Sequence, residues 1–334
     1  MIKTTQIKNH VKVKELKFKN PYRFPTYTCT GDDSFMLALI AGVRNAGKST
    51  LVLNIIEMEK KHLLADDSMV YFVSPTKDAK IDYFIETYPD NFKYVDELCM
   101  ASMKKVLTEM EARVSEWKAK YENYEILERY MKNPKLCTPE EIFFLHDVEF
   151  FNYGKLFEGF RTERPPLSTL VLDDSVGCPM ICDGRSKDGR WFQKFALKHR
   201  HYPYYCNVFI LSQYIKAIAK YYRTNCSWVM LFPFRDFNCL KAVFDEYSIL
   251  FKNNINNFLN LIEDIRARND HSFVNIYYDK VQYVRIGFNE ECDFSATPVC
   301  AIEKPACIPK APKKKQLCGG GTPTEDKPPN SPRP

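Results

Sequence analysis

The sequence has no uninterrupted apolar run long enough to span a lipid bilayer and no apolar leader at its start. The longest apolar run, Phe35 to Val43 with Gly42 included, is far shorter than the roughly 20 residues that a membrane-spanning helix needs. No apolar segment follows Met1 to Lys8, as it would in a secretory signal peptide. We therefore expect a soluble protein without membrane contact, in a cytosol-like compartment.

Metal-ligand spacing is also lacking, although the chain has 12 cysteines. Cys178 and Cys182 are spaced C-x₃-C, and the histidines on either side of Arg200 have no paired Cys or His partner. No carboxylate cluster typical of a nuclease is evident. The 20 Tyr and 24 Phe form no patterned platform for stacked bases, so we expect most of them in the core. These absences predict reduced thiols and no zinc site.

Charge and composition divide the chain into three parts. Residues 31–290 are expected to form one main domain, and residues 303–334, rich in proline, glycine and lysine, a disordered basic tail. Residues 1–30 form a basic arm that would either attract polyanions or serve as a solvated face. This arm contains one acidic residue, Glu15, and seven basic residues: Lys3, Lys8, Lys12, Lys14, Lys17, Lys19 and Arg23.

Short apolar runs alternate with helix-forming segments from residue 35 onward, which is the pattern of βαβ units. The first run, Phe35 to Ala41, is typical of a strand buried on both faces of a parallel sheet. Further strands are expected at 69–75, 167–173, 207–213 and 228–233, with a closing hairpin at 273–278 and 281–288. Helices are expected at 49–61, 191–198, 215–222, 237–250 and 253–266. We predict an α/β fold with a mainly parallel sheet and helices on both faces.

A charged helical insertion is predicted at about 97–135. Its apolar residues recur with a 4-3 spacing that places them on one stripe of a long helix. They are Met103, Leu107, Met110, Val114, Trp117, Tyr121 and Tyr124. The stripe would either pack on its own domain or bind a coiled-coil partner.

Residues 42–49 read Gly-Val-Arg-Asn-Ala-Gly-Lys-Ser and match the phosphate-loop pattern G-x-x-x-x-G-K-[ST] in full. The motif begins where a buried strand ends and finishes where a helix begins, as that pattern requires; the alternative is a plain strand-to-helix turn. Backbone N–H groups of such a loop face phosphates, Lys48 would reach the β- and γ-phosphates, and Ser49 would bind Mg²⁺. We therefore predict a P-loop NTPase with ATP and Mg²⁺ as cofactors. The predicted nucleotide-binding residues are Gly42, Asn45, Ala46, Gly47, Lys48, Ser49 and Thr50.

Two carboxylates follow the predicted strand at 167–173. Asp173 would hold Mg²⁺, and Asp174 would polarise the water that attacks the γ-phosphate. The alternative is a strand terminus followed by a helix cap. Because a phosphate loop precedes them in the chain, the pair favours the metal and general-base roles.

Three more polar residues are candidates for the reaction. Gln213 ends the strand at 207–213, at the edge where ligands of such sheets bind, so it could contact the γ-phosphate or its water. Arg200 and Arg223 are the cations best placed by sequence to neutralise transition-state charge, within one subunit or across an interface. An exposed loop amide and ordinary surface arginines are the alternatives.

The order of these motifs resembles that of the DNA-packaging ATPases of the FtsK/HerA superfamily, in particular those of poxvirus-like large DNA viruses, virophages and Polinton-type elements. The resemblance covers residues 30–290 approximately. It is carried by Gly42 to Thr50, Asp173-Asp174, Arg200-His201, Gln213 and Arg223-Thr224-Asn225. Many members of the superfamily have Glu where this chain has Asp174.

The resemblance implies ATP-driven translocation of double-stranded DNA into a viral capsid, by a homo-oligomeric ring that meets capsid vertex proteins. The host cytoplasm or the virion would be its location. It also implies that Lys48 and Ser49 bind Mg·ATP, that Asp173 is the metal-side acid and Asp174 the water-activating acid, and that Gln213 is the sensor. Arg200 or Arg223 would complete a neighbouring site.

Two other functions are compatible with a phosphate loop. One is a P-loop kinase that acts on a small substrate, and the other is a non-motor ATPase switch for capsid assembly. The long basic N-terminus and the 125 positions between Lys48 and Asp173 favour the motor. DNA-stimulated ATP turnover would separate the three.

Overall fold

The computed structural model describes residues 22–31, 35–147, 157, 160–234, 236–268, 271–278 and 282–294. Most of the predicted basic arm, up to residue 21, and the whole predicted tail lie outside these residues. The arm and the tail therefore stay predictions. Everything below concerns the described part of the chain.

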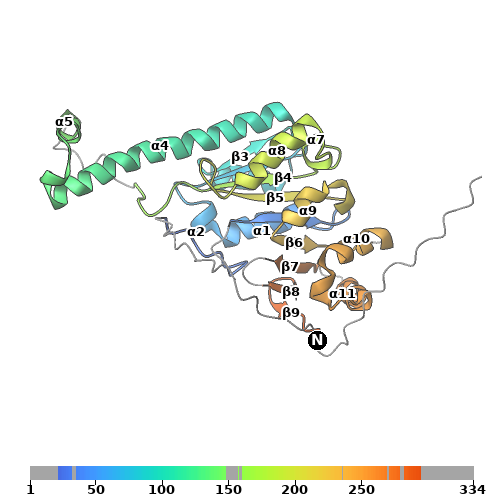
Figure 1. The fold of residues 1–334 in the computed structure, drawn as a ribbon. Helices are drawn as coiled ribbons and strands as arrows, with labels where there is room; N and C mark the ends of the chain where they lie inside the picture. Colours follow the sequence, from blue (N-terminus) through green and yellow to red (C-terminus); the bar gives the residue numbers. More distant parts are fainter. Residues whose placement is uncertain are drawn as a thin grey trace, which may run out of the picture. The chain divides into compact units, whose positions relative to one another are not determined.

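Nine strands in the described ranges form one mixed sheet, in the order β3-β2-β4-β5-β1-β6-β7-β8-β9 (Figure 1). They are β1 (Leu37–Ala41), β2 (Met69–Val73), β3 (Phe92–Val95), β4 (Ser168–Leu172), β5 (Cys206–Ser212), β6 (Trp228–Leu231), β7 (Val274–Tyr278), β8 (Gln282–Ile286) and β9 (Glu290–Glu291). The strands from β3 to β6 in this order run parallel, and β7, β8 and β9 are added antiparallel at one edge. β1, β4 and β5 are buried along their whole length, as expected for central strands covered on both faces.

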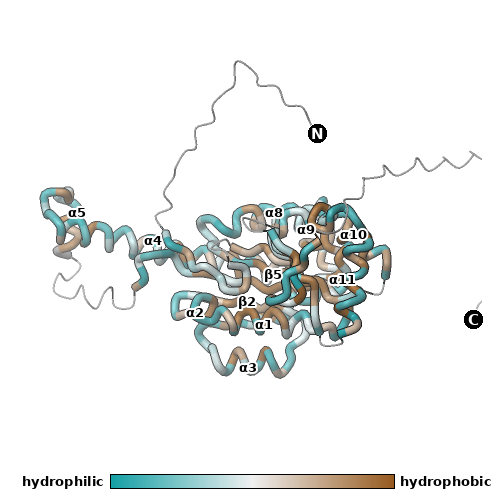
Figure 2. Tube along the Cα trace, turned by 90° about the horizontal axis from the view of Figure 1, so that it is seen from below, coloured by the Kyte–Doolittle hydropathy of each residue, from teal (hydrophilic) through white to brown (hydrophobic). Residues whose placement is uncertain are grey.

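Helices cover both faces of the sheet (Figure 2). On one face lie α1 (Lys48–Met58), α2 (Lys60–Leu63) and α3 (Ala79–Thr87), whose apolar residues share a core cluster with β1 and β2. On the other face lie α4 (Met100–Lys132), α7 (Pro179–Cys182), α8 (Lys187–Lys198), α9 (Lys220–Asn225), α10 (Phe237–Tyr247) and α11 (Ile255–Arg268). The predicted α/β class, with a mainly parallel sheet and helices on both faces, is confirmed.

The predicted insertion contains α4, a single helix of 33 residues that leads through η1 (Pro134–Leu136) to α5 (Pro139–Asp147). Its stripe is buried from Met103 to Trp117 and packs on the core beneath it. Tyr121 continues the stripe by stacking on Trp117, with ring centroids 4.8 Å apart. The stripe therefore packs on its own domain. Neither α4 nor any other described helix is long and apolar enough to cross a membrane.

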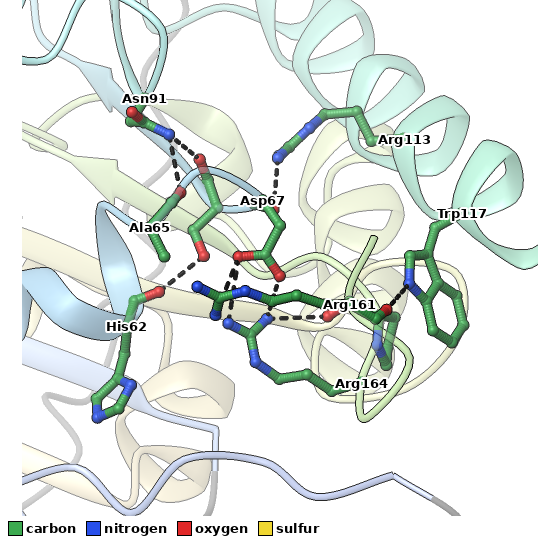
Figure 3. A network of polar contacts seen from close by, with 10 residues as sticks. His62, Ala65, Asp67, Asn91, Arg113, Trp117, Arg161 and Arg164 are labelled. Atoms are coloured by element: carbon green, nitrogen blue, oxygen red, sulfur yellow. Dashed lines mark hydrogen bonds and ion pairs between the residues drawn. The ribbon is translucent and has the colours of Figure 1, made fainter. Parts of the chain in front are cut away.

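A polar network fastens α4 to the amino ends of β2 and β4 (Figure 3). The Asp67 carboxylate, just before β2, accepts hydrogen bonds from Arg164 at 2.8 and 3.3 Å and lies 3.5 Å from Arg161. From α4, Arg113 donates to the Asp67 carbonyl at 2.9 Å and the Trp117 indole donates to the Arg161 carbonyl at 2.8 Å. Both Asp67 carboxylate oxygens thus face a guanidinium, and the bonds from Arg113 and Trp117 hold the insertion against the segments that precede β2 and β4.

Some segments differ from the elements expected from the sequence. The helix expected at 215–222 is divided into η3 (Ile215–Ala217) and α9, because Ile218 and Ala219 have extended backbone angles. The strand β3 and the preceding helix α3 were not expected. β3 is short and only its first residue is buried, so it lacks the apolar run that marks the central strands. α3 is preceded by Asp78, whose carboxylate caps the Lys80 and Ile81 amides.

Candidate active site

The loop between β1 and α1 requires glycine at two positions. A Cβ on Gly42 would lie 2.6 Å from the Phe232 Cβ, because β6 runs beside β1 and the Phe232 amide bonds the Ala41 carbonyl. Gly47 has φ +102°, a left-handed conformation that costs other residues free energy, and α1 begins at the next residue. The chain therefore turns tightly between the two glycines, and the N-terminus of α1 points at the loop, an arrangement that can bind a phosphate.

Lys48 is buried, with 8% of its surface exposed. Its ammonium donates to the carbonyls of Gly42 and Val43, at 3.0 Å each. Burial lowers the pKa of Lys48, and the nearby Asp173 and Asp174 carboxylates oppose that shift. Among the described residues Lys48 has no carboxylate within ion-pair distance, so a phosphate oxygen would supply the anionic partner that these neutral carbonyls do not.

Ser49 and Asp173 meet across the carboxyl ends of the central strands. The Ser49 hydroxyl donates to Asp173 Oδ2 at 2.8 Å, and the Asp174 amide donates to Asp173 Oδ1 at 2.9 Å. Burial raises the pKa of Asp173, and these two hydrogen bonds oppose the shift. A hydroxyl and a carboxylate suit Mg²⁺, which takes one or two protein oxygens and completes its shell with phosphates and waters. The described residues contain no cluster of three or more acidic, His or Cys side chains for a metal.

Asp174 has a strained backbone and a defined partner. Its φ is +49°, a conformation that costs a residue with a Cβ about 1 kcal/mol. Asp174 Oδ1 accepts a hydrogen bond of 2.9 Å from the Gln213 amide nitrogen. The contact forms because β4 and β5 are parallel neighbours, so residues that follow them lie at one edge. Both side chains line a cavity whose rim includes the exposed Val176 and Tyr214.

The two arginine candidates lie away from the loop. Arg200 follows α8 and is exposed at the amino ends of the strands, on a cavity of about 270 Å³ shared with Thr224 and Asn225. Arg223 pairs with Glu246 at 2.8 Å, with only 14% of its side chain exposed, and also contacts the Ile218 carbonyl. The structure therefore brings Lys48, Ser49, Asp173, Asp174 and Gln213 together and leaves Arg200 and Arg223 outside that group.

Sequence reasoning missed several residues beside the loop. The loop lines a cavity of about 710 Å³ together with Lys80, whose ammonium contacts the Thr50 hydroxyl, and His271, whose Nδ1 lies 3.3 Å from the Ala46 carbonyl. The cavity is also lined by Phe232, Phe273 and Phe288. These residues come from four distant segments, and no local pattern marks them.

No family model and no curated protein matches the chain. Among solved structures, it is similar to the genome packaging NTPase B204 from Sulfolobus turreted icosahedral virus 2 in complex with AMP, at 10% identity over 76% of this chain and 96% of that chain, with a TM-score of 0.40. It is also similar to the pCW3 conjugation coupling protein TcpA, at 15% identity over 75% of this chain and 60% of that chain, with a TM-score of 0.38. A third is the cytoplasmic domain of the type VII secretion ATPase EccC from Thermomonospora curvata, at 12% identity over 76% and 25% of the two chains, with a TM-score of 0.38.

The similarity of this chain to these solved structures is low. At identities of 10 to 15% and TM-scores of 0.40 or less, they transfer neither residue roles nor a function. What can be proposed for this chain rests on its own geometry and motifs.

Proposed function

We propose that this chain is a P-loop ATPase that uses ATP to drive double-stranded DNA into a viral capsid. The observation that carries the ATPase part is the pairing of four side chains at one sheet edge, Ser49 with Asp173 at 2.8 Å and Asp174 with Gln213 at 2.9 Å, next to the buried Lys48. A phosphate loop, a metal-side acid and a second acid with an oriented partner are the parts that phosphoryl transfer to water needs.

Each residue has a role that follows from its position. The loop amides and Lys48 bind the phosphates, and Ser49 and Asp173 hold Mg²⁺. Bound Mg²⁺ would neutralise charge on the phosphate oxygens. Asp174 accepts a proton from the attacking water, and Gln213 orients the Asp174 carboxylate through its amide. Gln213 can then transmit the state of the site along β5.

A site of this kind is completed by a second subunit. The Asp174–Gln213 pair is exposed, so one chain alone does not enclose the reacting water, and Arg200 is exposed at the opposite ends of the strands. A head-to-tail ring would bring Arg200 of one subunit to the phosphates of the next. Arg223, held by Glu246, is assigned to the fold of its own subunit. The DNA part of the function rests on the order of the motifs and on the basic arm.

Turnover of ATP with and without duplex DNA tests the function. A motor is stimulated strongly by DNA of any sequence, whereas a small-molecule kinase or an assembly switch is not. Mixing tests the ring: Lys48→Ala and Arg200→Ala are each expected to be inactive, and a mixture of the two should regain part of the wild-type turnover. Inactive mixtures of stable oligomers would exclude Arg200 as the shared residue.

A further inference from the structure

One side of the cavity beside the loop has no part in the proposed phosphate binding. Its volume of about 710 Å³ falls within the range of small-molecule sites, and the loop with Thr50 accounts for one side of it. The other side is an aromatic wall, which we define as Phe232, Phe273 and Phe288. A Cβ on Gly47 would lie 3.7 Å from Phe232 Cε1, so the wall begins directly beside the loop.

The three rings of the aromatic wall support one another. The centroids of Phe232 and Phe273 are 5.5 Å apart, and those of Phe273 and Phe288 are 5.4 Å apart in an edge-to-face arrangement. Phe232 and Phe273 are core residues, with 2% and 7% of their surface exposed. Phe288 is only partly buried, so of the three rings it has the most surface available to a ligand in the cavity.

The backbone beside Phe288 is anchored by hydrogen bonds. The Gly287 amide donates to the Phe273 carbonyl at 2.9 Å, and the amide side chain of the fully buried Asn275 donates to the Gly287 carbonyl at 2.9 Å. Asn275 is in turn bonded to the Trp228 indole at 2.6 Å. Because these bonds fix the chain next to Phe288, little ordering entropy is lost when a ligand packs on the ring.

We propose that the aromatic wall is the nucleobase site of this ATPase, with Phe288 as the ring on which the base stacks. This inference rests on the proposed function, because it takes the phosphates to lie on the loop. A nucleotide held there extends its base into the rest of the same cavity, and an aromatic ring offers a base a flat apolar surface. The wall therefore contributes to affinity for nucleosides and not to affinity for phosphates.

The test compares ATP and GTP with inorganic tripolyphosphate, which has the phosphates but no base. Binding of each is measured by calorimetry on the full chain, for wild type, Phe288→Ala, Phe288→Tyr and the control Phe143→Ala, which removes an exposed ring on α5. Loss of one stacked ring weakens nucleotide binding about tenfold. Phe288→Ala should do so for ATP and GTP and leave tripolyphosphate binding unchanged, while Phe288→Tyr and Phe143→Ala bind like wild type.

Each other outcome contradicts the assignment in a different way. Equal weakening of tripolyphosphate and ATP would mean that Phe288 supports the loop, and unchanged ATP binding by Phe288→Ala would place the base elsewhere. Both results leave the ATPase function standing if wild type hydrolyses ATP. A wild-type chain that binds neither ATP nor tripolyphosphate would overturn the ATPase function and the base site together.

Discussion

The two ends of the central strands carry charged clusters that differ in how their charges are paired. At the amino ends, the Asp67 carboxylate has a guanidinium partner on each oxygen (Figure 3). At the carboxyl ends, Lys48 bonds only carbonyls of its own loop, and Asp174 is exposed on a strained backbone. The carboxylate of the first cluster is paired inside the chain, whereas the second cluster has charges that a ligand can satisfy.

The pairing of a charged side chain separates charges that hold this fold together from charges that are available for binding or chemistry. Removing one partner of a charged pair inside the chain leaves the other charge buried and unpaired, and this destabilises the fold. Charged groups that are buried or strained without an ionic partner persist where binding or chemistry uses them. Changes at Asp67 and its arginines should therefore alter stability, and changes at Lys48, Asp173 and Asp174 should alter turnover.

The largest effect is expected for Lys48→Ala. The substitution removes the cation that we propose to face the transferred phosphoryl group, so ATP turnover should fall by roughly 10³-fold or more. Circular dichroism and the melting temperature should stay close to wild type, because Lys48 has no ionic partner among the described residues. The control Lys60→Ala removes an exposed lysine paired with Glu57 and should leave turnover unchanged. Turnover like that of wild type in Lys48→Ala would end the phosphate-loop assignment.

Asp174→Asn should come next. It leaves Ser49 and Asp173 in place for Mg·ATP but removes the carboxylate that we propose as the proton acceptor, so turnover should fall about 100-fold or more while ATP remains bound. Single-turnover quench measurements with labelled ATP would show the trapped nucleotide. Asp173→Asn should instead weaken Mg²⁺-dependent ATP binding. If Asp174→Asn lost nucleotide affinity and Asp173→Asn still hydrolysed ATP, the two roles would have to be exchanged.

Asp67→Asn probes the other cluster. Arg164, with 6% of its side chain exposed, would keep its charge and lose its anionic partner, so the free energy of unfolding should fall by about 2 to 3 kcal/mol. Urea unfolding measures the loss. ATP turnover per folded molecule should be unchanged. A loss of turnover without a loss of stability would contradict the separation of the two ends.

Lowering the pH should destabilise the chain through His199, which lies at the amino ends of the strands. Burial lowers the pKa of His199 to about 4, below the value of about 6.5 in an unfolded chain, and Nδ1 of the neutral ring bonds the Cys206 carbonyl at 2.6 Å. The unfolded chain therefore takes up a proton before the folded one as pH falls. Between pH 6.5 and pH 5 this linkage should lower the free energy of unfolding by about 2 kcal/mol.

Substitution isolates the contribution of this histidine. His199→Gln should remove most of that pH dependence, and the control His201→Gln, at an exposed neighbour, should keep it. Urea unfolding at several pH values measures both. Equal pH dependence in the two variants would show that another group is responsible.

The parts of the site that are local in sequence were predictable. Gly42 to Thr50 form a contiguous motif, and Asp174 and Gln213 meet because parallel strands end at one edge of a sheet. The order of the strands, which places β5 between β1 and β4, depends on long-range pairing that the motifs do not specify. The ion pair of Arg223 with Glu246 is likewise tertiary, and only the structure separates Arg223 from the exposed Arg200.

The aromatic wall was not predictable for a related reason. Phe232 follows β6, Phe273 precedes β7 and Phe288 lies after β8, and each fits the ordinary pattern of a core residue. Their common position beside the loop arises from the antiparallel addition of β7 and β8 to the edge next to β6. The sequence predicted the hairpin itself, but it did not predict where the hairpin joins the sheet.

The smallest effect is expected for Lys80→Ala, which tests whether an exposed cation at the carboxyl ends belongs to the functional cluster. Lys80 contacts the Thr50 hydroxyl and lines the loop cavity, and it makes no ion pair with another described residue. Because Lys80 is exposed and screened by solvent, its contact with a phosphate should be worth less than about 1 kcal/mol. ATP should bind about threefold more weakly at low salt, with a smaller difference at high salt because screening weakens exposed charge pairs. Lys77→Ala, which removes a neighbouring lysine paired with Asp82, is the matched control and should bind ATP like wild type. Equal weakening in both variants would mean a general field of positive charge, whereas a loss confined to Lys80→Ala would add Lys80 to the phosphate-binding residues.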